Sequence, residues 1–255
     1  MGIRNYYYRL DAWIRQRLFF SHYAKALERF RDVHASEKRC FIIGNGPSIK
    51  EQDLRLLNGE FTFATNYFVL HENFPEIGLR YLCMSNPRFW REGRLPANLL
   101  EVLEQYPELP LFFDFSFVSV NARRKYFSED RCFYVKVDLE SRVEDGKLSL
   151  DPTKGLCHGS TVIIDLCIPL AFFMGFREIY LLGCDCDYGL DKATDHSKAY
   201  FYNIAKQDTK PDPVDYMTQE WPRRVFGSYE EVKRVLGQHG GRIYNATRGG
   251  KLEVF

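Results

Sequence analysis

The sequence predicts an α/β fold in which a mostly parallel sheet is covered by helices on both faces. From residue 39 onward, short apolar runs alternate with stretches of helical spacing, a pattern typical of parallel strands joined by crossover helices. One long apolar stretch in the second half indicates a fully buried helix. The chain has 255 residues, of which 45% are hydrophobic and 27% charged, which excludes a disordered protein.

The expected elements follow in order along the chain. Strands are predicted at residues 40–43, 61–65, 81–84, 111–117, 132–137, 178–182 and 242–244, and helices at 50–57, 161–173 and 229–236. The apolar stretch Thr161–Phe176 is interrupted by Asp165 and Pro169, and a membrane span needs about 20 apolar residues, so a buried helix is predicted. Residues 207–221 are polar and contain prolines, which predicts a long loop, and a lid is placed at about 190–225.

Residues 1–38 are predicted to form an amphipathic helical segment ahead of a domain at 39–255. Apolar residues recur at helical spacing, namely Ile3, Tyr6, Leu10, Trp13, Phe20, Ala24 and Leu27. Residues 1–39 hold nine Lys/Arg against four Asp/Glu, whereas the rest holds 26 against 30. Three interpretations stay open: packing on the domain, peripheral contact with an anionic membrane, and a homo-oligomer seam.

The overall charge and the cysteines restrict the class of protein. A formal net charge of +1 argues against a nucleic-acid partner, because such proteins usually carry a strong basic excess. Seven cysteines scattered through apolar runs are typical of free buried thiols in a reducing compartment. The chain is charged from Arg4 and lacks the apolar core of a secretory signal, so a cytoplasmic location is predicted, at the inner face of the membrane if the helix binds lipid.

The first candidate binding motif is Gly44-Asn45-Gly46-Pro47-Ser48, between the first strand and a helix. Its glycines allow backbone amides to approach a ligand closely, and proline suits the first helical turn. The exposed N–H groups and the helix dipole then favour a phosphate. The motif lacks the third glycine of the dinucleotide fingerprint and the Gly-Lys-Ser/Thr ending of a P-loop, and a tight structural turn is the alternative.

Polar residues follow several predicted strands. Asn66 follows the second strand, Ser85 and Asn86 the third, and Asp185 the strand at 178–182. The carboxyl ends of parallel strands line one crevice, where ligands bind in Rossmann-like folds. Asparagine both donates and accepts hydrogen bonds, so it suits base edges and ribose hydroxyls, although each residue also suits a turn.

Two further groups of residues are candidates for chemistry. The sequence His158-Gly159-Ser160-Thr161 precedes the buried helix, and its hydroxyls suit either a helix cap or a cradle for a second charged group. Beyond the strand at 178–182, Asp185 and Asp187 form an Asp-x-Asp pair that is typical of magnesium sites. His196 follows in a polar segment, and histidine is the natural general base near neutral pH.

These motifs, in this order, carry a resemblance to known families. Residues 44–48, Asn66, 159–161, 174–185 and 243–255 resemble the MptE-like family, named for a hydroxymethylpterin pyrophosphokinase, with many members in surface-polysaccharide systems. The same motifs are similar to bacterial family 42 sialyltransferases. The resemblance covers about residues 39–255 and implies a Rossmann-like nucleotide-binding domain.

The resemblance implies a sialyltransferase-like glycosyltransferase of cell-surface polysaccharide synthesis. It would move a sugar from a CMP-linked, sialic-acid-like donor to a hydroxyl of a glycan acceptor, with no metal or other cofactor required. His196 corresponds to the catalytic base. The residues expected at the nucleotide-sugar are Gly44, Asn45, Gly46, Ser48, Asn66, Asn86, Gly159, Ser160, Thr161, Asp185 and Tyr188.

Two other functions remain open. The sialyltransferases carry a tyrosine two residues after the strand-end aspartate, whereas this chain has Asp187 there and Tyr188 one position later. Asp187 favours a Mg²⁺-dependent pyrophosphokinase or related phosphotransferase, in which Asp185 and Asp187 would bind the metal. The remaining alternative is a non-catalytic nucleotide-binding scaffold in a glycan assembly complex.

Overall fold

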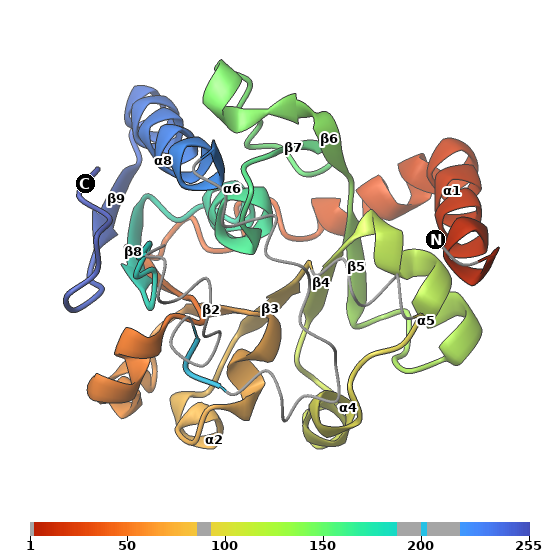
Figure 1. Cartoon of the computed structure of the whole chain (residues 1–255), viewed down its shortest axis with the longest axis horizontal. Coiled ribbons are helices and arrows are strands. Elements are labelled where there is room, and N and C mark those ends of the chain that lie inside the picture. The colour runs from red at the N-terminus through yellow and green to blue at the C-terminus, as the bar shows by residue number, and fades with distance from the viewer. Residues whose placement is uncertain (1–2, 86–92, 188–199, 203–219) are drawn as a thin grey trace.

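The computed structural model describes residues 3–85, 93–187, 200–202 and 220–255, with burial described from residue 10 onward. Its strands are β1 Arg39–Ile43, β2 Thr62–Thr65, β3 Tyr81–Met84, β4 Leu111–Asp114, β5 Cys132–Val135, β6 Val137–Arg142, β7 Leu156–His158, β8 Glu178–Leu182 and β9 Arg242–Asn245. Within these residues, seven parallel strands form one sheet in the order β5-β4-β3-β2-β1-β8-β9, and β6 and β7 form a separate parallel pair (Figure 1). The predicted parallel α/β architecture is therefore confirmed.

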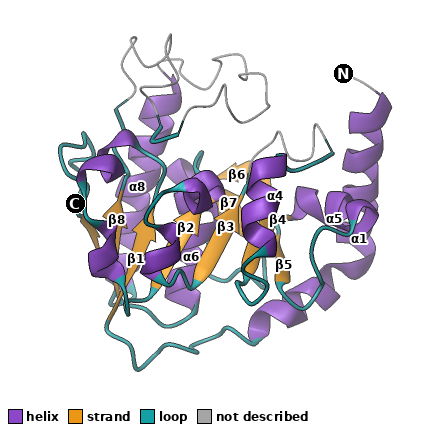
Figure 2. Cartoon of the chain, turned by 90° about the horizontal axis from the view of Figure 1, so that it is seen from below, coloured by secondary structure: helices purple, strands orange, loops and turns teal. Residues whose placement is uncertain are grey.

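Helices cover both faces of the large sheet (Figure 2). The α-helices are α1 Ile3–Glu28, α2 Phe74–Ile77, α4 Ala97–Glu104, α5 Val118–Arg124, α6 Ile168–Phe173 and α8 Glu220–Gln238. Short 3₁₀-helices are η1 Pro47–Glu51, η2 Leu54–Leu57, η3 Asn66–Leu70, η4 Phe115–Phe117 and η5 Val143–Asp145, and η6 Ile163–Cys167 is π-wound. Side chains alternate along a strand, so Ile42 packs under η6, α6 and α8, whereas Ile43 packs under η1, η2, α2 and α4.

Helix α1 packs across the β5 edge of the sheet and touches both hydrophobic cores. Leu27 and Phe30 join the core that contains α6, whereas Ala12 joins the core on the opposite face. The predicted seam is buried only near its end, because Leu27 is 1% exposed while Leu10 and Trp13 are 44% and 57% exposed. A domain boundary at residue 38 stays a prediction.

Several elements differ from the sequence prediction for local reasons. The strand expected at 111–117 ends at Asp114, because that side chain accepts a hydrogen bond from Ser116 N at 2.9 Å and starts η4. The helix expected at 50–57 is the pair of 3₁₀-helices η1 and η2. The helix expected at 161–173 is present, but its first part, Ile163–Cys167, is a π-helix. Pro169 follows in α6 and has no N–H to donate to an α-helical hydrogen bond. Helices α2, α4 and α5 and the pair β6–β7 were not predicted.

The C-terminal end of the predicted lid coincides with a helix. Helix α8 begins at Glu220, so residues 220–225 are helical. Pro222 is compatible with this start, because the first turn of a helix needs no intrahelical N–H donor. Residues 188–199 and 203–219 of the predicted lid and its surroundings lie outside the described residues. None of the helices described is both long and apolar enough to cross a membrane, and all seven cysteines are free.

Candidate functional site

The order of the strands reverses between β1 and β8. The chain winds outward from β1 to β5 and then returns to place β8 on the other side of β1. In open parallel sheets, a ligand crevice lies outside the carboxyl ends of the strands at such a reversal. The loop 44–46 follows β1 and the loop 183–187 follows β8, so the first and the last predicted motifs meet at this point.

Gly44 and Gly46 allow these two loops to touch. The N–H of Gly44 donates to the carbonyl of Leu182 at 2.8 Å, and that of Gly46 donates to the carbonyl of Gly183 at 2.9 Å. A β-carbon on Gly44 would lie 2.5 Å from the Gly183 oxygen, which is closer than atoms can approach. The glycines therefore allow the backbone of the loop 44–46 to contact the backbone of the loop 183–187, in addition to any contact with a ligand.

The carboxylate of Asp185 lies at the start of η1. Ser48 donates to it twice, from its N–H to Oδ1 at 3.2 Å and from its Oγ to Oδ2 at 2.8 Å. The N–H groups at a helix start favour a negative charge. The protein's own carboxylate thus takes the position at which the sequence predicts a phosphate.

Asp187 has a different partner from Asp185. Its Oδ1 is 2.7 Å from Nζ of Lys251, whose backbone N–H donates to the carbonyl of Asp185 at 2.7 Å. The two carboxylates suggested for Mg²⁺ are therefore each held by a separate part of the chain. Among the described residues, no cluster of three or more His, Cys, Asp or Glu is arranged to hold a metal ion.

Asn45 has a buried oxygen that accepts no hydrogen bond from the described residues. Its Nδ2 donates to the carbonyl of Thr65 at 3.1 Å and to Oγ1 of Thr65 at 3.0 Å. Because only the amide nitrogen can donate to a carbonyl, these bonds assign the oxygen to the other branch of the side chain. A buried acceptor without a donor costs free energy, so Oδ1 suits a donor group of a ligand or a water molecule.

Asn66, Ser85 and Asp114 link the carboxyl ends of β2, β3 and β4. Asn66 has a φ of +43°, which asparagine tolerates better than most residues, and its Oδ1 accepts a hydrogen bond from Ser85 N at 3.1 Å. The Ser85 side chain lies next to Asp114, which accepts a hydrogen bond from the Ser116 hydroxyl. Burial raises the pKa of Asp114, and the nearby Asp165 carboxylate adds to that rise.

The second predicted motif is organised around Asp165. Its Oδ1 accepts a hydrogen bond from Gly159 N at 2.5 Å, and its Oδ2 lies 3.0 Å from Nδ1 of His158. Ser160 has a φ of +70°, and Oγ1 of Thr161 accepts from Ile164 N at 3.3 Å, so the threonine caps the buried helix. The motif is thus held in a specific strained conformation at the start of the helix.

Asp165 and Asp114 were not singled out from the sequence. In the sequence, Asp165 only interrupts an apolar run. A buried carboxylate costs free energy unless it is paired, so its position in that run was the signal that it has a partner. Asp114 lay within a predicted strand. Of the predicted site residues, Asn86, Tyr188 and His196 lie outside the described residues.

The pH dependence of stability is expected to depend on His158. Burial disfavours its charged form, but the hydrogen bond and charge of Asp165 outweigh burial, so the pKa of His158 is raised. A raised folded-state pKa stabilises the fold below the unfolded pKa of about 6.5, and this contribution is lost as pH rises through the folded-state value. The difference in melting temperature between the wild type and His158→Gln is therefore expected to shrink from pH 5.5 to 8.5. His239→Gln is the control, and a difference that stays constant with pH contradicts the pairing.

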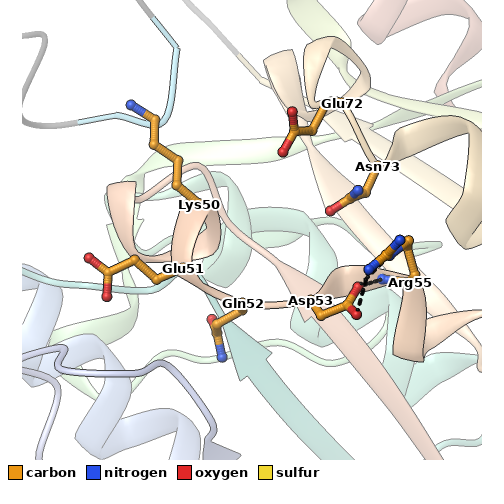
Figure 3. A pocket seen from close by; sticks show the side chains of 7 residues that line it. All are labelled: Lys50, Glu51, Gln52, Asp53, Arg55, Glu72 and Asn73. Carbon is orange, nitrogen blue, oxygen red and sulfur yellow. Dashed lines mark hydrogen bonds and ion pairs between the residues drawn. The ribbon is translucent and has the colours of Figure 1, made fainter.

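A polar hollow of ≈ 380 Å³ begins at Lys50, two residues after Ser48 in η1 (Figure 3). It is lined by Lys50, Glu51, Gln52, Asp53, Arg55, Glu72 and Asn73. Asp53 and Arg55 pair with each other at 2.7 Å, and both are largely exposed. None of the predicted site residues lines this hollow, so we place the candidate site at the carboxyl ends of the strands instead.

Comparisons with known proteins give a likeness in structure and none in sequence. No family model matches the sequence, and no curated protein matches it. The structure is similar to that of the sialyltransferase CstII from Campylobacter jejuni, solved in complex with a substrate analogue, cytidine-5'-monophosphate. The two chains are 16% identical, the TM-score is 0.44, and the match covers 84% of this chain and 82% of the other.

Proposed function

We propose that this protein is a glycosyltransferase that moves a sugar from a CMP-linked, sialic-acid-like donor to a saccharide hydroxyl. The observation that carries the proposal is the buried Oδ1 of Asn45, which accepts no hydrogen bond from the described residues, at the strand-order reversal. An acceptor held in one orientation suits the amino group of cytosine or a ribose hydroxyl. The resemblance of residues 44–48 to the sialyltransferase motif supports the same contact.

In the proposed reaction, the acceptor hydroxyl attacks the anomeric carbon of the sugar while the bond to the CMP phosphate breaks. His196 takes the proton of the hydroxyl, and CMP leaves with its phosphate oxygen negatively charged. The segment 159–161 holds the phosphate or the carboxylate of the donor, together with the protonated ring of His158. The raised pKa of His158 keeps this ring cationic over a wider pH range. Asn66, Asn86 and the other residues of the crevice surround the donor.

Nucleotide selectivity tests this function directly. Thermal melting is measured with CMP, CDP, UDP, ATP and GTP, each with and without Mg²⁺. A ligand at a hundred times its dissociation constant stabilises the fold by about 2.7 kcal/mol, which gives a clear shift. We expect CMP to stabilise the protein without metal. A response to ATP that requires Mg²⁺, and none to CMP, favours a phosphotransferase and contradicts the proposal.

Replacing Asn45 by alanine is expected to weaken CMP binding about tenfold, the loss that corresponds to about 1.4 kcal/mol for one buried hydrogen bond. Calorimetric titration with CMP measures the affinity. Asn58→Ala is the matched control, because Asn58 is exposed at the end of η2, away from the strand ends. If Asn45→Ala folds normally and binds CMP as tightly as the control, Asn45 does not contact the nucleotide.

A further inference from the structure

Helix α1 carries an exposed apolar ridge along one side. Leu10, Ile14 and Leu18 follow one another at intervals of four residues and are 44%, 39% and 66% exposed, with Trp13 beside them. Of the eight large hydrophobic side chains exposed in the described residues, five lie within residues 10–19. Single exposed apolar side chains need no explanation, but a contiguous group of them marks an interaction surface.

The ridge faces away from the domain. With 3.6 residues per turn, Leu10, Ile14 and Leu18 share the side of the helix opposite to Tyr23 and Leu27. The ring of Tyr23 packs edge-on against Phe115 and Tyr134, with centroids 5.2 and 5.3 Å apart, and Leu27 is buried. The ridge is therefore not the surface by which α1 packs on the sheet, and Figure 2 shows the first turns of α1 standing clear at the edge of the molecule.

The first turns of α1 lie toward the carboxyl edge of the sheet, which is the edge that holds the candidate site. Phe30, beyond the end of α1, contacts Phe133 near the start of β5, whereas Asp11 near the other end of the helix lies close to Ser119, which comes after β4 and η4. The helix consequently runs antiparallel to β4 and β5. A surface that binds the ridge therefore lies toward the same edge of the sheet as the site, although β4, β3 and β2 separate β5 from β1.

The charges around the ridge are basic. Residues 1–25 contain five Lys/Arg and one acidic residue, Asp11, which is paired with Arg15 at 2.9 Å. Arg17 lies over the Trp13 ring at 5.5 Å, and both it and Lys25 are exposed on the side of the ridge. Two copies of such a helix repel each other, whereas an anionic surface attracts it.

We propose that α1 binds the surface of an anionic lipid bilayer. Leu10, Ile14 and Leu18 insert at the boundary between headgroups and acyl chains, and Arg17 and Lys25 contact the lipid phosphates. The helix lies in the plane of the interface, since it is not apolar enough to cross the membrane. The proposal is independent of the reaction that the site performs.

Sedimentation of the full chain with lipid vesicles tests the proposal. Vesicles of equal parts phosphatidylglycerol and phosphatidylcholine are compared with vesicles of phosphatidylcholine alone. We expect the protein to bind only the anionic vesicles, and binding to fall in 0.5 M NaCl, a concentration that screens the charges. The double variant Ile14→Ser with Leu18→Ser is expected to bind at least tenfold less, because it removes most of the apolar contact.

The double variant Leu56→Ser with Leu139→Ser is the matched control, because Leu56 and Leu139 are 81% and 65% exposed at other places on the surface. It is expected to bind vesicles like the wild type. Equal vesicle binding by the ridge variant, or no binding to anionic vesicles, overturns the proposal. A lowered melting temperature of the ridge variant, with none in the control variant, also overturns it, because the ridge then packs within the fold. So does a dimer in sedimentation velocity that the ridge variant dissociates and the control variant does not, because the ridge is then the contact between two copies of the chain.

Discussion

Replacing Gly46 by alanine is expected to destabilise the fold by about 3 kcal/mol, at the upper end of the cost of overpacking. A β-carbon at this position would lie 1.8 Å from Oδ2 of Asp185 and 2.7 Å from the carbonyl oxygen of Gly183. Asp185 cannot move aside without losing both hydrogen bonds from Ser48, and the Gly183 oxygen belongs to the backbone. The two loops at the strand-order reversal must therefore separate, and CMP binding is expected to be lost with them.

Urea unfolding measures the change in the free energy of unfolding. Gly237→Ala is the matched control, because a β-carbon there meets no atom within 4 Å and the residue lies inside α8. Alanine is expected to leave stability unchanged or to raise it by up to about 1 kcal/mol at Gly237. If Gly46→Ala unfolds at the same urea concentration as the wild type, the close contact between the loops is not part of the native structure.

Replacing His196 by alanine is expected to lower turnover by about 10²–10⁴-fold, the usual contribution of a general base. The assay follows CMP release from a CMP-linked sialic acid in the presence of a saccharide acceptor. The proposed base contacts the acceptor hydroxyl and not the nucleotide, so CMP affinity is expected to stay within about twofold of the wild type. This separation of turnover from binding distinguishes loss of the base from general damage to the site.

His239→Ala is the control for this variant. His239 is exposed at the end of α8, and its Nδ1 lies 2.9 Å from the carbonyl of Val235, away from the strand ends. Its replacement is expected to leave turnover unchanged. Full turnover of His196→Ala would falsify the proposed mechanism. It would leave the proposal that the site binds CMP unchanged, because the Asn45→Ala variant tests that proposal separately.

The strands that could be predicted are those whose limits are set by local composition. The expected strands at 81–84 and 178–182 are β3 and β8, because each is an apolar run bounded by polar residues or glycine. The strand expected at 111–117 was too long, since Phe115 and Phe117 continue the apolar run and only the cap formed by Asp114 ends it.

The sequence predicted which polar residues follow the strands, but it did not predict their partners. A parallel sheet brings the ends of its strands to one edge, so Asn45, Asn66 and Asp185 were expected there from their positions after apolar runs. The partner of Asp185 is Ser48, 137 residues away along the chain, and no local pattern predicts such a contact. Asp165 likewise became a site residue only through its bonds to His158 and Gly159.

The amino-acid pattern alone established a parallel α/β protein with polar strand ends and a basic, aromatic helix at its start. The tertiary structure decided which charged side chains are paired with each other and which apolar side chains stay exposed. Trp13 and Leu27 are fourteen residues apart, which places them on the same side of a helix with 3.6 residues per turn, yet Trp13 is 57% exposed and Leu27 is 1% exposed. Spacing defines the faces of a helix, but only contacts between distant segments determine where along its length a face is covered.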